Sequence, residues 1–590
     1  MMDSPGIAVV AHTHHERRKI HDHDRSGRGR RRFGNDYASS SLVSSPAFRI
    51  LVILLLAALL VSNLLLLRLD YATTHGLGIL LPGRRRPQQL PDAPSDDDDG
   101  QSPHLYPRLP HLPAFPTIPN SDTLVHRTLY EDRPTIAGIA AILYRHLHAL
   151  HESNLLLAKS ISSSPKIGGK RRREEEAESV RESYFRIARE YLGAFEDAYV
   201  GRSVFDVRED ESVYVSIASF REHLLAETLV SAFGRAARPD RLFVGVIVNN
   251  CFGTDPNFPC TGTAELVGKD KDGFDILKSV DGKPDTNHIE TFCANATYQR
   301  YCDAGQVRAL YLHEIDALGP AAARYYSSKL WGGETYFMQV DSHLRFASHW
   351  DELYIRDLKL ASSYPRAVLS TYPPGFVNFR PDPPFLPGTR LCRCMIRIDE
   401  DYLPRVELRG HSGANETRPS QTPFQGAGLF FARAEYLRDV PFDPYLPWLF
   451  MGEEVALSIR AWTAGWNIYA PRKNLVGHQY RPLKMGNPHF WDGWGKFFHR
   501  PQLMDKLSPT THDRIKVMMG YPEFSAQDGT SGDDDDDDRS RVPSNYSLVE
   551  LKRYGLGTVR SREEYLKFAK IDLEKRTCGG LRWCAEGSLQ

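Results

Sequence analysis

Tyr336-Phe-Met-Gln-Val-Asp-Ser-His-Leu-Arg-Phe346 is a short apolar run that ends abruptly at two polar residues, Asp341 and His343. The run predicts a buried β-strand, in which side chains alternate between faces, so Asp341 and His343 project to the same side. Ligands of an open parallel sheet bind beyond the carboxyl ends of its strands, where this pair would lie. The pair therefore predicts part of a metal site, although an N-cap Asp and a surface His would produce the same tripeptide.

Basic residues crowd the first fifty positions, and a long apolar run follows them. The chain of 590 residues has 74 basic and 74 acidic side chains, so its net charge gives no indication of a nucleic-acid partner. Residues 50–67 are apolar except for Ser62 and Asn63, and about 18 residues are just enough to cross a bilayer. The positive charge before this run predicts a cytoplasmic tail over 1–49 and a transmembrane signal anchor over 50–67. A cleaved signal peptide is the alternative.

All eight cysteines follow the apolar run, on the side of the membrane where disulfides form. The last two, Cys578 and Cys584, are close enough in sequence to close a terminal loop, and we expect them to pair. Cys392 and Cys394 leave a zinc site open as an alternative, although no second pair of this kind accompanies them.

Three glycosylation sequons lie on the same side of the apolar run, at Asn295, Asn415 and Asn545. Together with the cysteines they indicate a secretory lumen. We therefore predict a single-pass type II protein of the Golgi or ER membrane, with its catalytic domain in the lumen.

The segment that follows the apolar run predicts a stem and then two helices. Residues 71–120 are rich in Pro and cannot bury a core, so they should stay extended. Apolar residues at helical spacing predict amphipathic helices over 135–161 and 180–199. These helices could form a homodimer through the stem or pack on the domain behind it, and we favour packing. The predicted parts are a stem with helices over 68–204 and a lumenal domain over 205–590, with an acidic insertion near 525–545.

From residue 213 the sequence alternates between strand and helix patterns. Strands over 213–217 and 242–248 enclose a helix over 222–233, which is a β-α-β unit and indicates a parallel sheet. A strand over 307–312 then leads through an Ala-rich helix containing Arg324 into the strand of the Asp-x-His motif. The fold class is therefore α/β. The chain has neither a Gly-x-Gly-x-x-Gly sequence nor a Walker loop, which argues against dinucleotide and P-loop chemistry.

Two acids and a further histidine follow later in the chain. Glu453 and Glu454 stand at the start of a predicted helix over 455–464, where first-turn acids are favourable by themselves. Paired acids beside a turn glycine and an apolar wall also suit the binding of sugar hydroxyls, and both interpretations stay open. A short apolar run ends at His478, a candidate ligand of the same kind as His343, although a lone His is more often structural.

Six motifs occur in a fixed order: Val213-Tyr-Val-Ser-Ile-Ala-Ser-Phe-Arg221, Met338-Gln-Val-Asp-Ser-His343, Phe442-Asp-Pro-Tyr445, Leu449-Phe-Met-Gly-Glu-Glu454, Ala461-Trp-Thr-Ala-Gly-Trp466 and Tyr469-Ala-Pro471. Over about 213–575 they resemble the polypeptide α-N-acetylglucosaminyltransferase family, which includes a hydroxyproline-modifying enzyme and protist Golgi enzymes that begin O-glycans. The Asp-Ser-His and Gly-His-x-x-Arg sequences also resemble the polypeptide N-acetylgalactosaminyltransferases. There the metal ligands are the Asp and His of the first motif and the His of the second. The resemblance thus implies Asp341, His343 and His478 as metal ligands.

The resemblance also implies a GT-A nucleotide-sugar transferase fold, a UDP-sugar donor and retention of anomeric configuration. One oxygen and two nitrogen ligands favour Mn²⁺ over the harder Mg²⁺ or Ca²⁺. Ser219 and Arg221 occupy the family's uridine-binding position, and Arg324 is expected at the diphosphate or donor sugar. Glu453 and Glu454 would hold sugar hydroxyls and orient the acceptor.

The predicted anchor, stem, cysteines and sequons differ from the best-known hydroxyproline enzyme, which is cytosolic. They favour a secretory polypeptide or glycan as the acceptor. UDP-N-acetylglucosamine is the expected donor, and UDP-galactose or UDP-N-acetylgalactosamine would use the same groups. A catalytically inactive lumenal scaffold or lectin is an alternative of a different class, against which the intact Asp and His residues argue.

Overall fold

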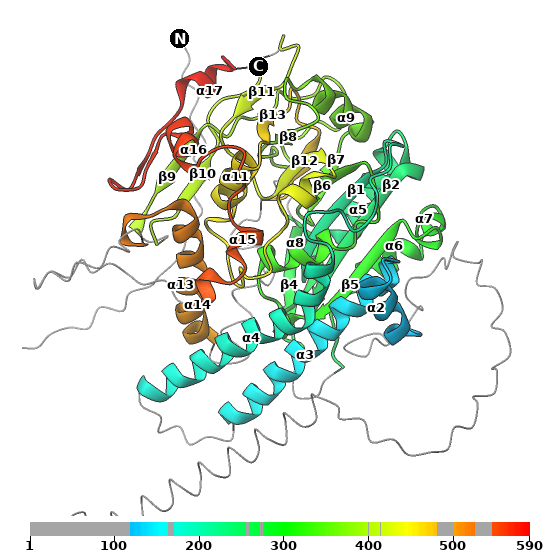
Figure 1. The fold of residues 1–590 in the computed structure, drawn as a ribbon. Coiled ribbons are helices and arrows are strands. Elements are labelled where there is room, and N and C mark those ends of the chain that lie inside the picture. Colours follow the sequence, from blue (N-terminus) through cyan, green and yellow to red (C-terminus); the bar gives the residue numbers. More distant parts are fainter. Residues whose placement is uncertain are drawn as a thin grey trace, which may run out of the picture. The chain divides into compact units, whose positions relative to one another are not determined.

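The computed structural model describes residues 118–162, 170–254, 259–271, 273, 275–398, 401–413, 415–480, 500–524 and 545–589 (Figure 1). All of them belong to one unit of the chain, Asp97–Gln590. Within these ranges no helix has the length and apolar character needed to cross a membrane. The predicted tail, signal anchor, Pro-rich stem and acidic insertion lie outside the described residues and stay predictions.

An eight-stranded mixed sheet forms the centre of the domain, in the order β11-β13-β8-β12-β6-β1-β2-β5. Its parallel half consists of β6 (Tyr336–Val340), β1 (Val213–Phe220), β2 (Leu242–Asn250) and β5 (Val307–His313). Its other half contains the antiparallel strand β12 (Leu429–Arg433), then β8 (Ala367–Ser370), β13 (Asn467–Ala470) and β11 (Ser420–Thr422). The α/β prediction and the four predicted strands of the parallel half are confirmed.

Two hydrophobic cores cover the two faces of this sheet, because successive side chains of its strands alternate between them. Tyr214 and Phe337 face the core that contains α8 (Pro320–Ser328). Val215 and Met338 face the other core, which contains α5 (Leu225–Arg235) and α9 (Trp350–Leu360). Burial on both faces explains why the strands are continuous apolar runs rather than alternating ones.

The helices before the sheet pack on the first of these cores, as the favoured interpretation predicted (Figure 1). They are α2 (Ser121–Tyr130), α3 (Ile136–Ser162) and α4 (Lys170–Ala198). His146 of α3 lies 2.9 Å from the Tyr326 hydroxyl, and Lys329 contacts Glu196 of α4 at 2.6 Å. The second predicted helix, over 180–199, begins earlier than expected: α4 also contains the charged segment 170–176, because Lys, Arg and Glu are good helix formers.

Four disulfides use all eight cysteines: Cys251–Cys260, Cys293–Cys302, Cys392–Cys584 and Cys394–Cys578. The expected pairing of Cys578 with Cys584 is therefore wrong. The C-terminal segment returns to β9 (Arg393–Ile396), and each of its two cysteines meets a different partner there. The zinc alternative is also wrong, because Cys392 and Cys394 have no thiol left for a metal.

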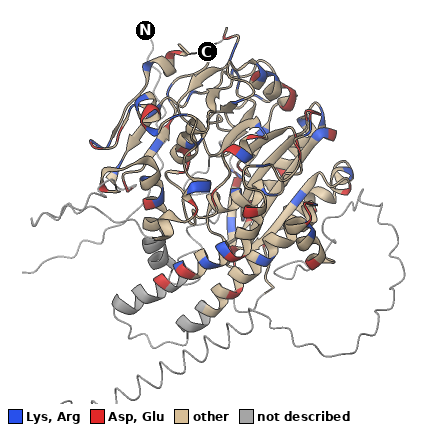
Figure 2. Cartoon of the chain, viewed as in Figure 1, with Lys and Arg blue, Asp and Glu red and all other residues tan. Residues whose placement is uncertain are grey.

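The other described elements surround the sheet. Figure 2 shows acidic and basic residues interspersed along them, in keeping with the zero net charge. The helices are α6 (His288–Cys293), α7 (Gln299–Asp303), α10 (Tyr436–Asp439), α11 (Glu453–Thr463), α13 (Arg500–Met519), α14 (Asn545–Leu548), α15 (Leu551–Tyr554), α16 (Arg562–Ala569) and α17 (Arg582–Glu586). The strands are β3 (Thr263–Lys269), β4 (Asp275–Val280), β7 (Leu344–Phe346), β10 (Pro404–Glu407), β14 (Val476–His478), β15 (Ile571–Asp572) and β16 (Thr577–Cys578).

Candidate metal centre and donor site

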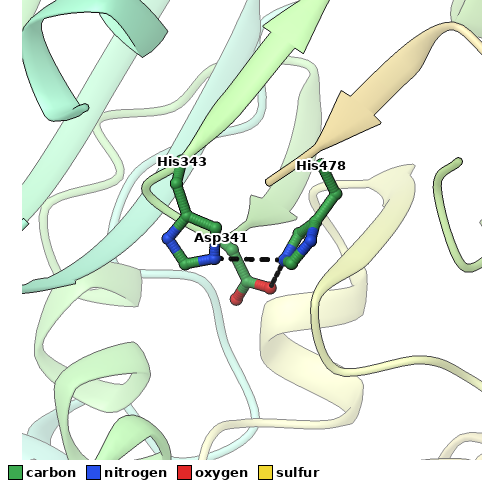
Figure 3. A group of neighbouring side chains, drawn as sticks. All are labelled: Asp341, His343 and His478. Carbon is green, nitrogen blue, oxygen red and sulfur yellow. Dashed lines mark hydrogen bonds and ion pairs between the residues drawn. The ribbon is translucent and has the colours of Figure 1, made fainter. Parts of the chain in front are cut away.

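Asp341, His343 and His478 come together beyond the carboxyl end of β6, and Figure 3 shows their side chains directed at one another. Asp341 directly follows β6, and His343 directly precedes β7. β14 pairs with β7 in antiparallel register, with His478 opposite Leu344. This pairing brings His478 beside His343 across 135 residues of sequence.

The distances within this group fit a bound divalent cation. Nε2 of His478 lies 3.1 Å from Nε2 of His343 and 3.2 Å from Oδ2 of Asp341. Metal–ligand bonds of about 2.1 Å place adjacent ligands of an octahedron about 3.0 Å apart. All three possible ligand atoms lie within 4.8 Å of one another, so one ion can reach them all. One carboxylate and two imidazoles suit a transition metal such as Mn²⁺.

Gly428 of the neighbouring chain segment provides the room that the Asp341 carboxylate occupies. The backbone N–H of Asp341 donates to the Gly428 carbonyl at 3.2 Å. A Cβ atom at position 428 would lie 2.6 Å from Oδ2 of Asp341, closer than a side chain can approach. A residue with a side chain at position 428 would therefore displace the Asp341 carboxylate from this arrangement.

Arg324 of α8 links the candidate ligand Asp341 to Glu453 of α11. Its Nη2 donates to Oδ1 of Asp341 at 3.1 Å, and its Nη1 donates to Oε2 of Glu453. Only 5% of Arg324 and 5% of Glu453 are exposed, so this ion pair is desolvated. The Nε atom of Arg324 has no hydrogen-bond partner within the described part of the chain. Burial would raise the pKa of Asp341, but the hydrogen bond to His478 and the charge of Arg324 hold that pKa well below its usual range.

Glu453 and Glu454 are the first two residues of α11, after Gly452 in the left-handed region at a φ of 90°. Glu454 accepts hydrogen bonds from the Tyr372 hydroxyl at 2.6 Å and from the Ala427 N–H at 3.0 Å. Burial raises the pKa of Glu454 to about 7, and these hydrogen bonds only partly oppose the shift. Glu454 can therefore hold or release a proton near neutral pH.

Ser219 and Arg221 lie at the carboxyl end of β1, where the sequence places them. The Ser219 hydroxyl is buried and lacks a hydrogen-bond partner among the described residues, which leaves it available to a ligand. Arg221 differs, because all five of its N–H groups are used. They donate to Asp285, Glu314, Thr261 and Thr263 at 2.7 to 3.1 Å. Arg221 thus braces the loops around this edge of the sheet.

Sequence reasoning missed two residues that support the site. Tyr372 donates a hydrogen bond to Glu454, and Glu222 lies 2.9 Å from Nδ1 of the candidate ligand His343. Glu222 was expected to begin a helix, but α5 starts at Leu225 and Glu222 lies in the connection after β1. An acid immediately after Arg221 at the end of a predicted strand is the signal that could have indicated it.

The glycosyltransferase (GlcNAc) family model matches residues 212–575, which is more than half of the chain. This chain belongs to that family. All eight predicted site residues fall within the matched region. The protein is therefore a glycosyltransferase.

Solved structures that resemble this glycosyltransferase share little sequence with it. GalNAc-T7 with UDP, GalNAc and Mn²⁺ is 15% identical, with a TM-score of 0.33, over 72% of this chain and 66% of that chain. TarS of S. aureus in complex with UDP-GlcNAc is 13% identical, with a TM-score of 0.28, over 53% of this chain and 73% of that chain. These TM-scores are too low to establish a shared fold. No curated protein matches the chain in sequence.

Proposed function

We propose that this glycosyltransferase moves N-acetylglucosamine from UDP-GlcNAc to a hydroxyl of a secretory polypeptide or glycan, with retention of configuration. The convergence of Asp341, His343 and His478 at the carboxyl edge of the sheet carries the proposal. The GlcNAc family match supports the donor sugar. The mixed sheet with a parallel half supports a GT-A fold.

Asp341, His343 and His478 would hold Mn²⁺ or another divalent cation. When bound, such a cation neutralises the charge that UDP develops as it leaves. Arg324 adds a second positive charge beside Asp341, and its Nε–H, which has no partner among the residues that the structure describes, is available for the diphosphate or the donor sugar.

Ser219 would contact uridine through its hydroxyl, which has no partner within the described ranges, and Arg221 would shape the same site through the loops that it braces. Glu453 and Glu454 would hold the sugar hydroxyls and orient the acceptor. We assign no nucleophile, because attack assisted by the leaving phosphate needs none.

The catalytic domain would lie in the lumen of the Golgi or ER, behind a transmembrane anchor over 50–67. Four disulfides support an oxidising compartment, and all three sequon asparagines (Asn295, Asn415 and Asn545) are exposed to solvent. On intact vesicles, a protease should digest the N-terminal tail and spare residues after Arg68. Digestion of the large domain would contradict this topology.

A donor screen tests the catalytic proposal. The full-length protein in detergent is given UDP-GlcNAc, UDP-GalNAc or UDP-galactose with Mn²⁺, and release of UDP is measured. UDP-GlcNAc should be hydrolysed fastest, and a chelator should stop the reaction. Faster use of another donor would replace GlcNAc in the proposal, and turnover unaffected by the chelator would remove the metal.

A further inference from the structure

Glu222 lies directly behind the candidate metal ligand His343. Its Oε2 is 2.9 Å from Nδ1 of His343, while Nε2 on the other side of the ring lies 3.1 Å from Nε2 of His478. Only 3% of Glu222 is exposed. One ring nitrogen therefore contacts a buried carboxylate, and the other is directed to the place where the three candidate ligands meet.

Glu222 is itself fixed by contacts that extend to the β3–β4 hairpin. Its Oε1 accepts a hydrogen bond from the Leu224 N–H at 3.0 Å and lies 3.1 Å from Nδ1 of His223. Nε2 of His223 lies 2.9 Å from Oδ2 of Asp275, which also pairs with Lys269 at 2.5 Å. A chain of largely buried polar contacts thus runs from the hairpin through Glu222 to His343.

We infer that Glu222 is a positioning residue that fixes both the ring orientation and the tautomer of His343. An ionised carboxylate can only accept hydrogen bonds, so Glu222 selects the ring form that carries its proton on Nδ1. Nε2 then presents its lone pair toward Asp341 and His478. Carboxylates behind metal-binding histidines act in this way in many metal sites. The inference rests on the metal assignment of the proposed function.

Glu222→Gln tests the inference with little change in side-chain shape. The amide can donate as well as accept, so it no longer selects the Nδ1–H form of His343. With UDP present, Mn²⁺ should bind the full-length variant about 10- to 100-fold more weakly, measured from the electron paramagnetic resonance signal of free Mn²⁺. Turnover should recover as Mn²⁺ is raised.

Glu334→Gln is the matched control, because Glu334 is also a fully buried carboxylate. It accepts from Arg308 at 2.7 Å and precedes β6, whereas Asp341 follows that strand. An extended chain rises about 3.3 Å per residue, so Glu334 and Asp341 lie about 20 Å apart. The control should melt at a lower temperature and keep its Mn²⁺ affinity.

Glu222→Asp keeps the buried charge and serves if Glu222→Gln does not fold. Its shorter side chain cannot accept from the Leu224 N–H and still reach Nδ1 of His343, so Mn²⁺ binding should weaken here too. If the folded Glu222 variants bind Mn²⁺ as tightly as wild type, the inference about Glu222 is wrong, while the metal assignment stands. Failure of the wild-type protein to bind Mn²⁺ with UDP overturns the metal assignment, and the inference falls with it.

Discussion

Asp341→Asn replaces one carboxylate oxygen with an NH₂ group, which removes the negative charge and leaves the side-chain shape unchanged. Asp341 is the only anion among the three candidate ligands. Its loss should weaken Mn²⁺ binding more than the 10- to 100-fold typical of residues behind the ligands, so we expect a decrease of at least about 100-fold. Metal-dependent turnover should fall with it.

The same change should also destabilise the metal-free protein. From the sequence alone Asp341 has no partner, and no loss of stability would be expected. In the structure Asp341 lies 3.1 Å from Arg324 and 3.2 Å from His478. Arg324 keeps its pair with Glu453 in the variant, so the cost should stay below the loss of a whole buried ion pair. We expect about 1–3 kcal/mol.

Titration of Mn²⁺ in the presence of UDP, with thermal unfolding of the metal-free protein, measures both effects. Asp357→Asn is the control, because Asp357 is 4% exposed and binds the Arg472 side chain at 2.5 Å without contacting a candidate ligand. It should lose comparable stability and keep its Mn²⁺ affinity. Equal Mn²⁺ affinity in wild type and Asp341→Asn would refute the metal centre. An unchanged melting temperature would refute the role assigned to Arg324.

Three further predictions concern the acids of α11 and the C-terminal disulfides. Glu453→Gln and Glu454→Gln should lower kcat while the Kd for UDP stays the same, and unchanged kcat in both variants would reduce these residues to first-turn acids. Because the pKa of Glu454 is raised from 4.5 to about 7, the stability from its bound proton is present below about pH 4.5 and lost as the pH rises through 7. At pH 8 the Glu454→Gln variant should therefore be more stable than wild type, by up to about 3 kcal/mol in the free energy of unfolding, and it should melt at a higher temperature. At pH 5 the two melting temperatures should approach each other, and the opposite trend would exclude a neutral Glu454. Cys578→Ser breaks the disulfide with Cys394, which spans 184 residues, and should lower the free energy of unfolding by about 2–5 kcal/mol, measured by thermal unfolding. A variant as stable as wild type would show that the C-terminal segment needs no covalent link.

Periodicity alone was sufficient to predict the four strands of the parallel half, because strand alternation is a local property and β6 ends where the apolar run ends. Asp341 and His343 lie between β6 and β7 and not within a strand, so their proximity comes from the turn that joins these strands and not from the predicted alternation. The partner of β7 is not local, because β14 reaches it across more than a hundred residues. The apolar run before His478 made it a candidate ligand, but only the family resemblance joined it to Asp341 and His343, because no spacing in the sequence indicates the contact.

Charged residues between β1 and α5 show why the rest of the site escaped prediction. A helix start accounts for Glu222 in the sequence, and its local contacts with Leu224 and His223 give no indication of a site. The partners that fix the roles of these two residues are remote: Arg221 contacts Asp285 and Glu314, and Glu222 contacts His343. Burial then fixes what each residue can do, because a buried charge must be paired and a fully paired arginine has no donor left for a ligand.

The first-turn and site interpretations of Glu453 are compatible once Arg324 is included. Glu453 gains from the amino end of α11 as any first-turn acid does. It also shares one buried guanidinium with Asp341, so the two carboxylates compete for the same positive charge. If the charge of Glu453 is removed, Arg324 pairs with Asp341 only. The positive charge of Arg324 then neutralises Asp341 more fully, which should lower the affinity of Asp341 for a cation. A helix-start acid in this fold would thus act on a candidate metal ligand through a single side chain.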